Sequence, residues 1–279
     1  MPETITVKLW PDGAPLATGT ADADVPQIAV HLPEKPGGGC VLVCPGGGYQ
    51  GLAAHEGAAF GEFFAARGIT AAVLRYRHAP GYRHPAPLLD VSRAMRTLRH
   101  RAGEWRFDPH RIAVMGFSAG GHLASTLCTH FDAGNAAAAD AVDRESCRPD
   151  LGVLCYPVIT MRGEFAHVGS RNNLLGEREK EEELRAMLSN DEHVTRETPP
   201  TFLFHTADDD VVLVENATQY AAALRRHGVP FALHVYEKGA HGVGLASDNP
   251  ALSSWSGSLV TWLNGHGWGG ATAASQPSR

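Results

Sequence analysis

Short apolar runs alternate with amphipathic stretches along most of the chain, and this alternation restricts the fold more than any other feature. Residues 39–44 (GCVLVC), 69–76 (ITAAVLRY) and 111–116 (RIAVMG) are dominated by apolar side chains, as is typical of strands buried on both faces. Residues 88–101 instead place apolar side chains at helical spacing, with Arg and His on the opposite face. Such an order predicts a mostly parallel, doubly wound α/β sheet with helices on both faces.

The same pattern continues to the C-terminus. Residues 4–10 alternate weakly, as in an edge strand, within a lead-in over residues 1–37. Further strands are expected at residues 151–156, 199–206 and 231–236. Further helices are expected at residues 56–67, 119–130, 215–227 and 253–263.

One stretch interrupts the alternation. Residues 162–196 contain a run of charges and predict a small, mostly helical, cap-like insertion. We expect residues 1–268 to form a single domain, because large α/β domains often exceed about 250 residues. Residues 269–279 are small and polar, and we expect them to be a disordered tail.

Composition excludes several classes of protein. Hydrophobic residues make up 43% and charged residues 19%, which is typical of a folded globular protein. The net charge of −6 gives no general attraction for nucleic acid or anionic lipid. The five cysteines show no C-x-x-C spacing, so we expect free thiols in a reducing compartment. No basic leader and no long apolar run is seen, so we expect a soluble cytoplasmic protein and no membrane partner.

A G-x-S-x-G motif at residues 116–120 is the strongest chemical signal. The predicted strand 111–116 runs directly into it, and the predicted helix 119–130 runs directly out. A serine on such a turn is held in a strained conformation that exposes its hydroxyl. Ser118 is therefore our candidate nucleophile; the alternative is a turn of small residues in which the serine only caps the helix.

A serine hydroxyl needs a base to remove its proton and a third group to orient that base. Three consecutive aspartates, Asp208, Asp209 and Asp210, follow the predicted strand 199–206. Asp208 leaves the strand first and is our prediction for the acid, with the other two as alternatives. His241 follows the last strand between small residues and is our prediction for the base. The chain order Ser, Asp, His is that of α/β-hydrolases.

A glycine run follows the first buried strand. Its backbone N–H groups can point into a cavity, because glycine has no Cβ. We expect Gly47 and Gly48, together with Ala119, to donate hydrogen bonds to the negative oxygen of a tetrahedral intermediate. Tyr49 comes next, and we predict that it lines the substrate pocket, with a core aromatic side chain as the equal alternative.

The same loop also matches a different motif. Gly46, Gly48 and Gly51 form a G-x-G-x-x-G between a strand and a helix, which suggests an NADP-binding oxidoreductase with Arg75 near the 2′-phosphate. The acid expected about 20 residues later is missing, and the Ser–Asp–His set stays unexplained. An H-E-x-x-H motif begins at His55 but lacks its second histidine. We therefore expect no metal and no cofactor.

Taken together, these segments resemble α/β-hydrolases of the esterase/lipase superfamily. The chain is most similar to the bacterial acetyl-esterase and acetyl-xylan-esterase-like group. Many lipase relatives carry His where this chain has Pro45. The segments that carry the resemblance are PGGGY at 45–49, HEG at 55–57, LRYRHAP at 74–80, RIAVMGFSAGGHLAS at 111–125, LCYPVI at 154–159, TFLFHTADDDVV at 201–212 and YEKGAHGVGL at 236–245.

This resemblance implies hydrolysis of short acyl esters, above all acetyl esters on sugars or xylo-oligosaccharides, through an acyl-enzyme. It also implies that residues 162–196 partly cover the site. A lipase-like esterase is one alternative. A peptidase of this fold usually carries an extra domain, for which 279 residues leave no room, and a binding module tends to lose a member of the triad. The oligomeric state is left open.

Overall fold

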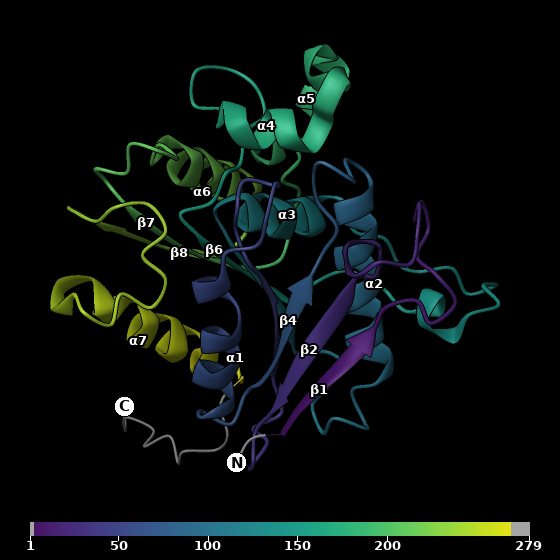
Figure 1. The fold of residues 1–279 in the computed structure, drawn as a ribbon. Helices are drawn as coiled ribbons and strands as arrows, with labels where there is room; N and C mark the ends of the chain where they lie inside the picture. The colour runs from purple at the N-terminus through teal and green to yellow at the C-terminus, as the bar shows by residue number, and fades with distance from the viewer. Residues whose placement is uncertain (1–2, 269–279) are drawn as a thin grey trace.

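The computed structural model describes residues 3–268, and its centre is an eight-stranded sheet (Figure 1). The strands follow the order β1-β2-β4-β3-β5-β6-β7-β8. All neighbours from β4 to β8 run parallel, whereas β2 is antiparallel to both β1 and β4. The strands are β1 (Glu3–Lys8), β2 (Gln27–Leu32), β3 (Cys40–Cys44), β4 (Thr70–Arg75), β5 (Ile112–Phe117), β6 (Leu151–Cys155), β7 (Thr201–Thr206) and β8 (Phe231–Tyr236).

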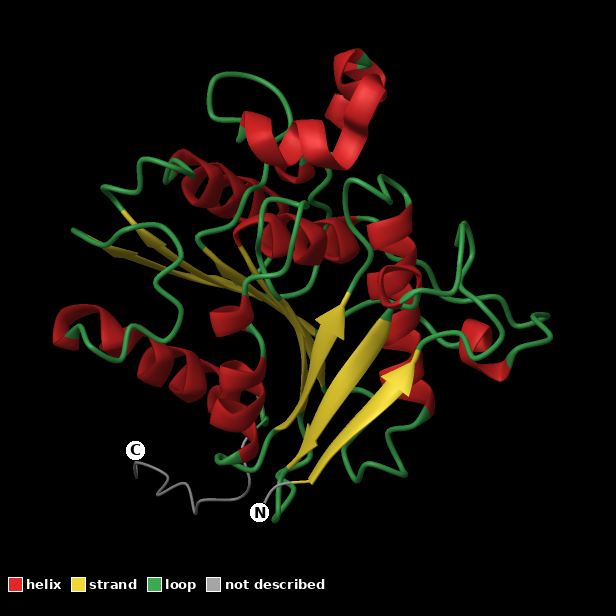
Figure 2. Cartoon of the chain, viewed as in Figure 1, coloured by secondary structure: helices red, strands yellow, loops and turns green. Residues whose placement is uncertain are grey.

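Helices cover both faces of this sheet (Figure 2). One face packs against α1 (Ala58–Ala65) and α7 (Pro250–Gly265), and the other against α2 (Ala86–His100), α3 (Ser118–Thr129) and α6 (Glu215–His227). Each face buries its own apolar cluster, with Phe60 and Trp255 in one and Met95 and Leu224 in the other. The predicted doubly wound α/β architecture is therefore confirmed.

The lead-in contains a strand that the sequence pattern did not predict. Residues Gln27–Leu32 form β2, which lies between β1 and β4. Ile28 and Val30 are fully buried, while Ala29 between them is less so. Alternation over only Ile28, Val30 and Leu32 is too short to separate a strand from a loop by period alone.

The register of the strands brings the loops that follow β3, β5 and β6 together at one edge of the sheet. Cys44 pairs with Gly116, and Phe117 pairs with Cys155, so the segments after β3, β5 and β6 begin side by side. The chain leaves β3 towards β4 on one side and later returns to β5 on the other. Loops diverge at such a switch point, and the crevice between them is where α/β sheets bind ligands.

Between β6 and β7 the chain makes a helical excursion at the top of Figure 1, above α3 and α6. It contains α4 (Val168–Leu175) and α5 (Glu182–Met187), joined and followed by the 3₁₀ turns η4 (Gly176–Lys180) and η5 (Asn190–Glu192). Asn190 is fully buried, and its Nδ2 donates to Ser125 Oγ (2.7 Å) and Thr126 Oγ1 (3.0 Å) of α3. The end of the excursion is therefore fixed to that helix.

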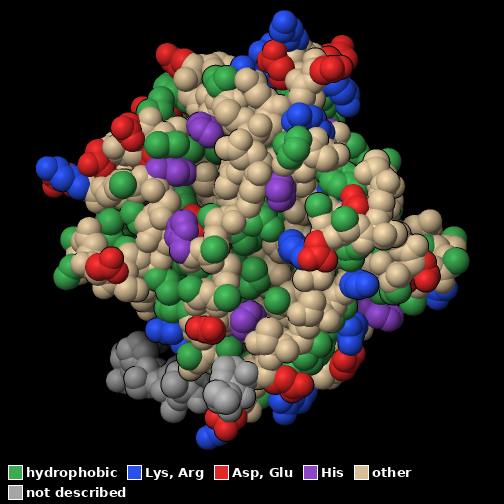
Figure 3. Space-filling model, in the orientation of Figure 1, with side chains coloured by type: hydrophobic (Ala, Val, Ile, Leu, Met, Phe, Trp, Pro, Cys, Tyr) green, Lys and Arg blue, Asp and Glu red, His purple; other side chains and the backbone are tan. Residues whose placement is uncertain are grey.

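On the surface, acidic and basic side chains are interspersed over the face seen in Figure 3. No helix within residues 3–268 is long and apolar enough to cross a lipid bilayer. Residues 269–279, which we expect to be a disordered tail, lie outside the described residues.

Candidate active site

Ser118 is the first residue of α3 and follows β5 directly. Its φ of 51° lies in the left-handed region, which costs a non-glycine residue about 1–3 kcal/mol. Gly120 makes the tight turn possible, because a Cβ at that position would lie 2.2 Å from the carbonyl oxygen of Cys44. The predicted strand–turn–helix around the serine is thus present, and it holds the hydroxyl at the edge of the sheet.

His241 lies on the loop between β8 and α7, and its ring reaches the serine. The distance from His241 Nε2 to Ser118 Oγ is 2.8 Å, within hydrogen-bond range. The ring of Tyr156 meets the imidazole edge to face, with the centroids 5.2 Å apart. The structure therefore brings together the serine and the histidine that the sequence singled out.

The prediction of Asp208 as the third member is wrong, because the adjacent Asp209 occupies that place. Asp209 Oδ2 accepts a hydrogen bond from His241 Nδ1 at 2.7 Å, and only 3% of Asp209 is exposed. Asp208 is exposed, and its Oδ1 accepts instead from the N–H of Gly239 at 2.7 Å. Ala207 N–H still donates to Tyr236 O, so pairing with β8 continues one residue past β7 and the inward turn comes one residue later than expected.

Hydrogen bonds keep the Asp209 carboxylate ionised. Burial by itself raises the pKa, but donors from His205, His241 and the Val212 N–H outweigh it and hold the pKa of Asp209 well below its ordinary value. His205 Nε2 lies 3.3 Å from Asp209 Oδ2 and 2.8 Å from Val212 O. No sequence pattern points to this contact, because the pattern around His205 indicates only a buried residue of a strand.

The glycine loop after β3 lies against the serine. A Cβ on Gly46 would lie 3.0 Å from Ser118 Cβ, so this close approach requires glycine. The N–H groups of Gly47, Gly48 and Ala119 donate no hydrogen bond to any residue between 3 and 268. All three remain available to an oxygen bound at Ser118, and their role in stabilising it stays a prediction.

Tyr49 does not line a substrate pocket as predicted. Only 1% of it is exposed, and its hydroxyl lies 2.8 Å from His122 Nδ1. His122 Nε2 in turn lies 2.8 Å from Leu188 O. This pattern fits a neutral imidazole that accepts from Tyr49 and donates to Leu188. The two side chains therefore join the glycine loop, α3 and the excursion within the core.

Burial of His122 predicts a loss of stability in acid. Burial lowers the pKa of His122 from its ordinary 6.5 to about 4. Between these values the unfolded chain binds more protons, so stability falls as pH falls. From pH 7 to pH 5, this one group is expected to cost about 2 kcal/mol of unfolding free energy. Urea unfolding at both values should show this loss in the wild type and not in His122→Asn.

The control for this experiment is His227→Asn, at an exposed position at the end of α6. It should keep the wild-type dependence of stability on pH. Parallel losses in the wild type and in His122→Asn between pH 7 and pH 5 would show that His122 does not carry the effect.

The helical excursion reaches the edge of the site. Asn173 Nδ2 on α4 donates to Gly48 O at 2.8 Å. His167, the N-cap of α4, has a lowered pKa, for which burial is the larger cause and the charge of His241 a second one. The start of α4 therefore lies near the imidazole of His241.

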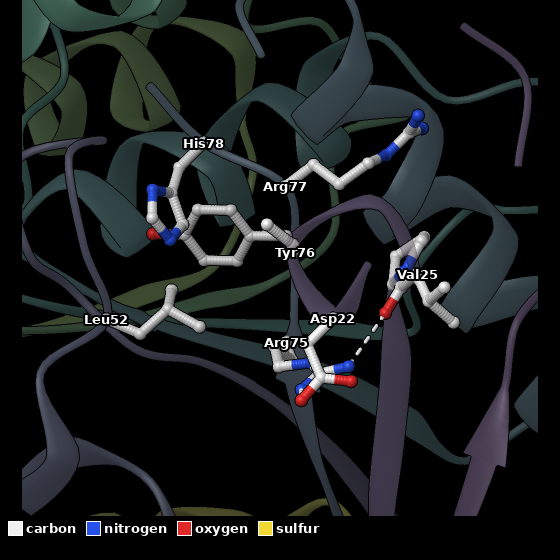
Figure 4. A pocket seen from close by; sticks show the side chains of 9 residues that line it. Asp22, Val25, Leu52, Arg75, Tyr76, Arg77 and His78 are labelled. Carbon is white, nitrogen blue, oxygen red and sulfur yellow. Dashed lines mark hydrogen bonds and ion pairs between the residues drawn. The ribbon is translucent and has the colours of Figure 1, made fainter. Parts of the chain in front are cut away.

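A separate hollow of about 210 Å³ opens beyond the glycine loop (Figure 4). Leu52, Arg75 and His78 contribute to its wall, and none of the three triad residues does. Arg75 lies 3.6 Å from Asp22 and donates to Val25 O, so its guanidinium already has protein partners.

The glycine loop does not resemble a phosphate cradle. The N–H of Gly46 donates to the buried carboxylate of Glu56 at 2.7 Å. A negative charge held at this place repels a pyrophosphate, which needs backbone N–H groups and a positive environment. The geometry therefore speaks against the NADP-binding alternative.

The strand order defines the α/β-hydrolase fold, and the hydrogen bonds that join Ser118, His241 and Asp209 have the geometry of a serine triad, whose catalytic role stays a prediction. More narrowly, the chain belongs to the BD-FAE family, whose model matches residues 28–224. The resemblance inferred from the sequence is thereby confirmed.

Relatives of known name lie close in sequence and structure. Endo-1,4-beta-xylanase B of Butyrivibrio fibrisolvens is 41% identical over 227 residues, which cover 78% of this chain and 34% of the relative. The acetylxylan esterase of Xylanibacter ruminicola is 35% identical over 225 residues, covering 79% and 44% respectively. This chain thus spans less than half the length of these two relatives.

One solved structure matches over nearly its whole length. The acetyl ester-xyloside bifunctional hydrolase from Caldicellulosiruptor lactoaceticus has a TM-score of 0.90 and is 45% identical. The match covers 96% of this chain and 98% of the solved chain. The same fold therefore extends over almost all of both molecules.

Proposed function

We propose that this chain is a serine carboxylesterase that removes short acyl groups, above all acetyl, from the hydroxyls of sugars such as xylo-oligosaccharides. The hydrogen-bonded series of Ser118, His241 and Asp209 carries the proposal. It supplies the nucleophile, a base within reach of it and a carboxylate that orients the base. Relatives named acetylxylan esterase and acetyl ester-xyloside hydrolase support acetylated sugars as the substrate class.

In the proposed reaction, His241 takes the proton from Ser118 Oγ while that oxygen attacks the ester carbonyl. The N–H groups of Gly47, Gly48 and Ala119 then hold the negative oxygen of the tetrahedral intermediate. His241 passes the proton to the leaving sugar hydroxyl, and an acyl-enzyme remains. Water, deprotonated by the same imidazole, then attacks the acyl carbonyl. The bond between the acyl carbon and Ser118 Oγ breaks, His241 returns the proton to Oγ, and the acid is released.

Residues 162–196 act in this proposal as a partial cap of the single domain. The Asn173 contact with the glycine loop and the position of His167 near His241 support that role. The five cysteines are buried and free, which fits a reducing compartment, and on that ground we place the protein in the cytoplasm.

Acyl-chain preference tests the substrate class. For p-nitrophenyl esters, kcat/KM is expected to fall by more than about tenfold from acetate to octanoate, because a site suited to acetyl, as we propose, has no space for the additional methylenes. Acetate release from acetylated xylo-oligosaccharides should exceed that from other acetylated sugars. Ser118→Ala serves as the blank for both assays. A preference for octanoate would contradict the proposal and favour a lipase-like esterase.

A further inference from the structure

A buried carboxylate lies behind the loops that carry Ser118 and His241. Within residues 3–268 it makes no hydrogen bond to the side chains of Ser118, His241 or Asp209. Glu56, at the end of the 3₁₀ turn η2 (Ala54–Glu56), is only 2% exposed. Its Oε2 accepts from the N–H of Gly46 at 2.7 Å, and its Oε1 accepts from the hydroxyl of Tyr156 at 2.8 Å. One carboxylate thus joins the glycine loop to the end of β6.

Tyr156 extends this connection to the histidine loop. Its hydroxyl oxygen accepts from the N–H of Gly244 at 3.1 Å, and Gly244 O accepts from Trp255 Nε1 at 3.1 Å. Burial, and then the charge of Glu56, hold the pKa of the Tyr156 hydroxyl well above its ordinary value, so it stays protonated and donates to Glu56. The tyrosine ring also packs edge to face against His241.

The charge of Glu56 cannot itself assist the reaction. A second negative charge near the tetrahedral oxygen raises the energy of the transition state, and burying a carboxylate is costly. Its hydrogen bonds are therefore the feature that can favour catalysis. Because Glu56 occupies the Gly46 N–H, the next two amides of the loop, those of Gly47 and Gly48, are the ones left for a substrate oxygen.

We propose that Glu56 is a positioning residue for ester hydrolysis. Through Gly46 on one side and Tyr156 on the other, it fixes the oxyanion loop and the His241 loop relative to one another. This inference rests on the proposed esterase function. Glu56 touches no reacting atom, so its loss acts on the geometry of the transition state and not on the binding of the ester.

Three variants separate the two arms of this connection. Glu56→Ala removes both arms and should lower kcat for p-nitrophenyl acetate by about 10²–10³, as loss of one oxyanion donor does, while KM changes by less than about threefold. Glu56→Gln keeps an oxygen for the Gly46 N–H and should retain at least about tenfold more kcat than Glu56→Ala. Tyr156→Phe keeps the ring and the Glu56–Gly46 arm but removes the hydroxyl, and with it both the bond to Glu56 and the bond from Gly244, with an expected loss of about tenfold.

A transition-state probe distinguishes positioning from a general effect on folding. An arylboronic acid forms a tetrahedral adduct with a serine oxygen, so its affinity should fall in parallel with kcat across the three variants. Tyr220→Phe is the matched control, because Tyr220 is fully buried and its hydroxyl has no hydrogen-bond partner among the described residues. It should keep wild-type kcat and wild-type boronic acid affinity.

Three results would overturn the inference. They are kcat within about threefold of wild type for folded Glu56→Ala, unchanged boronic acid affinity where kcat has fallen, or a kcat for Glu56→Gln no higher than that of Glu56→Ala. If Glu56→Ala does not fold, Tyr156→Phe alone decides in the same way. Ser118→Ala is assayed alongside: activity that survives it refutes the esterase mechanism, whereas its loss combined with fully active Glu56 variants refutes only the positioning role.

Discussion

Replacing Ser118 by alanine is expected to lower kcat/KM for p-nitrophenyl acetate by about 10⁵-fold, to the level that binding and the oxyanion amides alone provide. The variant has no oxygen to attack the carbonyl, so no acyl-enzyme forms. Steady-state hydrolysis followed at 400 nm, with a correction for spontaneous hydrolysis, measures the effect.

The variant should remain folded. Ser118 is 8% exposed, and the substitution removes only its hydroxyl, whose one side-chain hydrogen bond among the described residues is with His241. Near-wild-type circular dichroism and an unfolding midpoint within a few degrees are expected. Hydrolysis that persists at more than about 1% of the wild-type rate would mean that another residue is the nucleophile.

Asp209→Asn is expected to lower kcat by about 10³–10⁴-fold. The carboxylate accepts the Nδ1 proton of His241 at 2.7 Å and so presents an unprotonated Nε2 to the serine. An amide can turn its NH₂ towards Nδ1, which favours the opposite tautomer, in which Nε2 carries the proton and cannot act as a base. The ratio of the kcat of purified Asp209→Asn to the kcat of the wild type, whose active sites are titrated, measures this loss.

Asp208→Asn is the matched control, since it makes the same chemical change one residue away. An asparagine there can still accept from Gly239 N–H through its amide oxygen. We expect kcat within about tenfold of wild type. If Asp208→Asn were the more damaging of the two, the acid would have to be reassigned to Asp208 and the geometry of this turn would be wrong.

The order of elements and the approximate position of the site could be predicted from the sequence. Apolar runs marked β3, β5, β7 and β8, and in a parallel sheet the loops that follow these strands all open at the same edge. Ser118 was the one serine and His241 the one histidine of its loop, and glycines flank both. A single candidate could therefore be chosen for the nucleophile and for the base.

Choices between neighbouring residues depend on details that periodicity does not carry. Asp209 and not Asp208 contacts His241, because pairing with β8 continues through Ala207, which delays the turn by one residue. Tyr49 is buried because His122 supplies a partner for its hydroxyl, and these residues are 73 positions apart. Glu56 likewise has a recognisable role only through its contacts with Gly46, 10 residues away, and Tyr156, 100 residues away in the chain.

The site of covalent modification by a fluorophosphonate tests the central claim most directly. The wild-type protein is labelled, digested and mapped by tandem mass spectrometry, with Ser118→Ala and Asp209→Asn in parallel. We expect one phosphonylated serine, Ser118, with the fluoride lost, no labelling of Ser118→Ala and much slower labelling of Asp209→Asn. A label on any other residue, or equally fast labelling of Ser118→Ala, would contradict the assignment of Ser118 as the nucleophile.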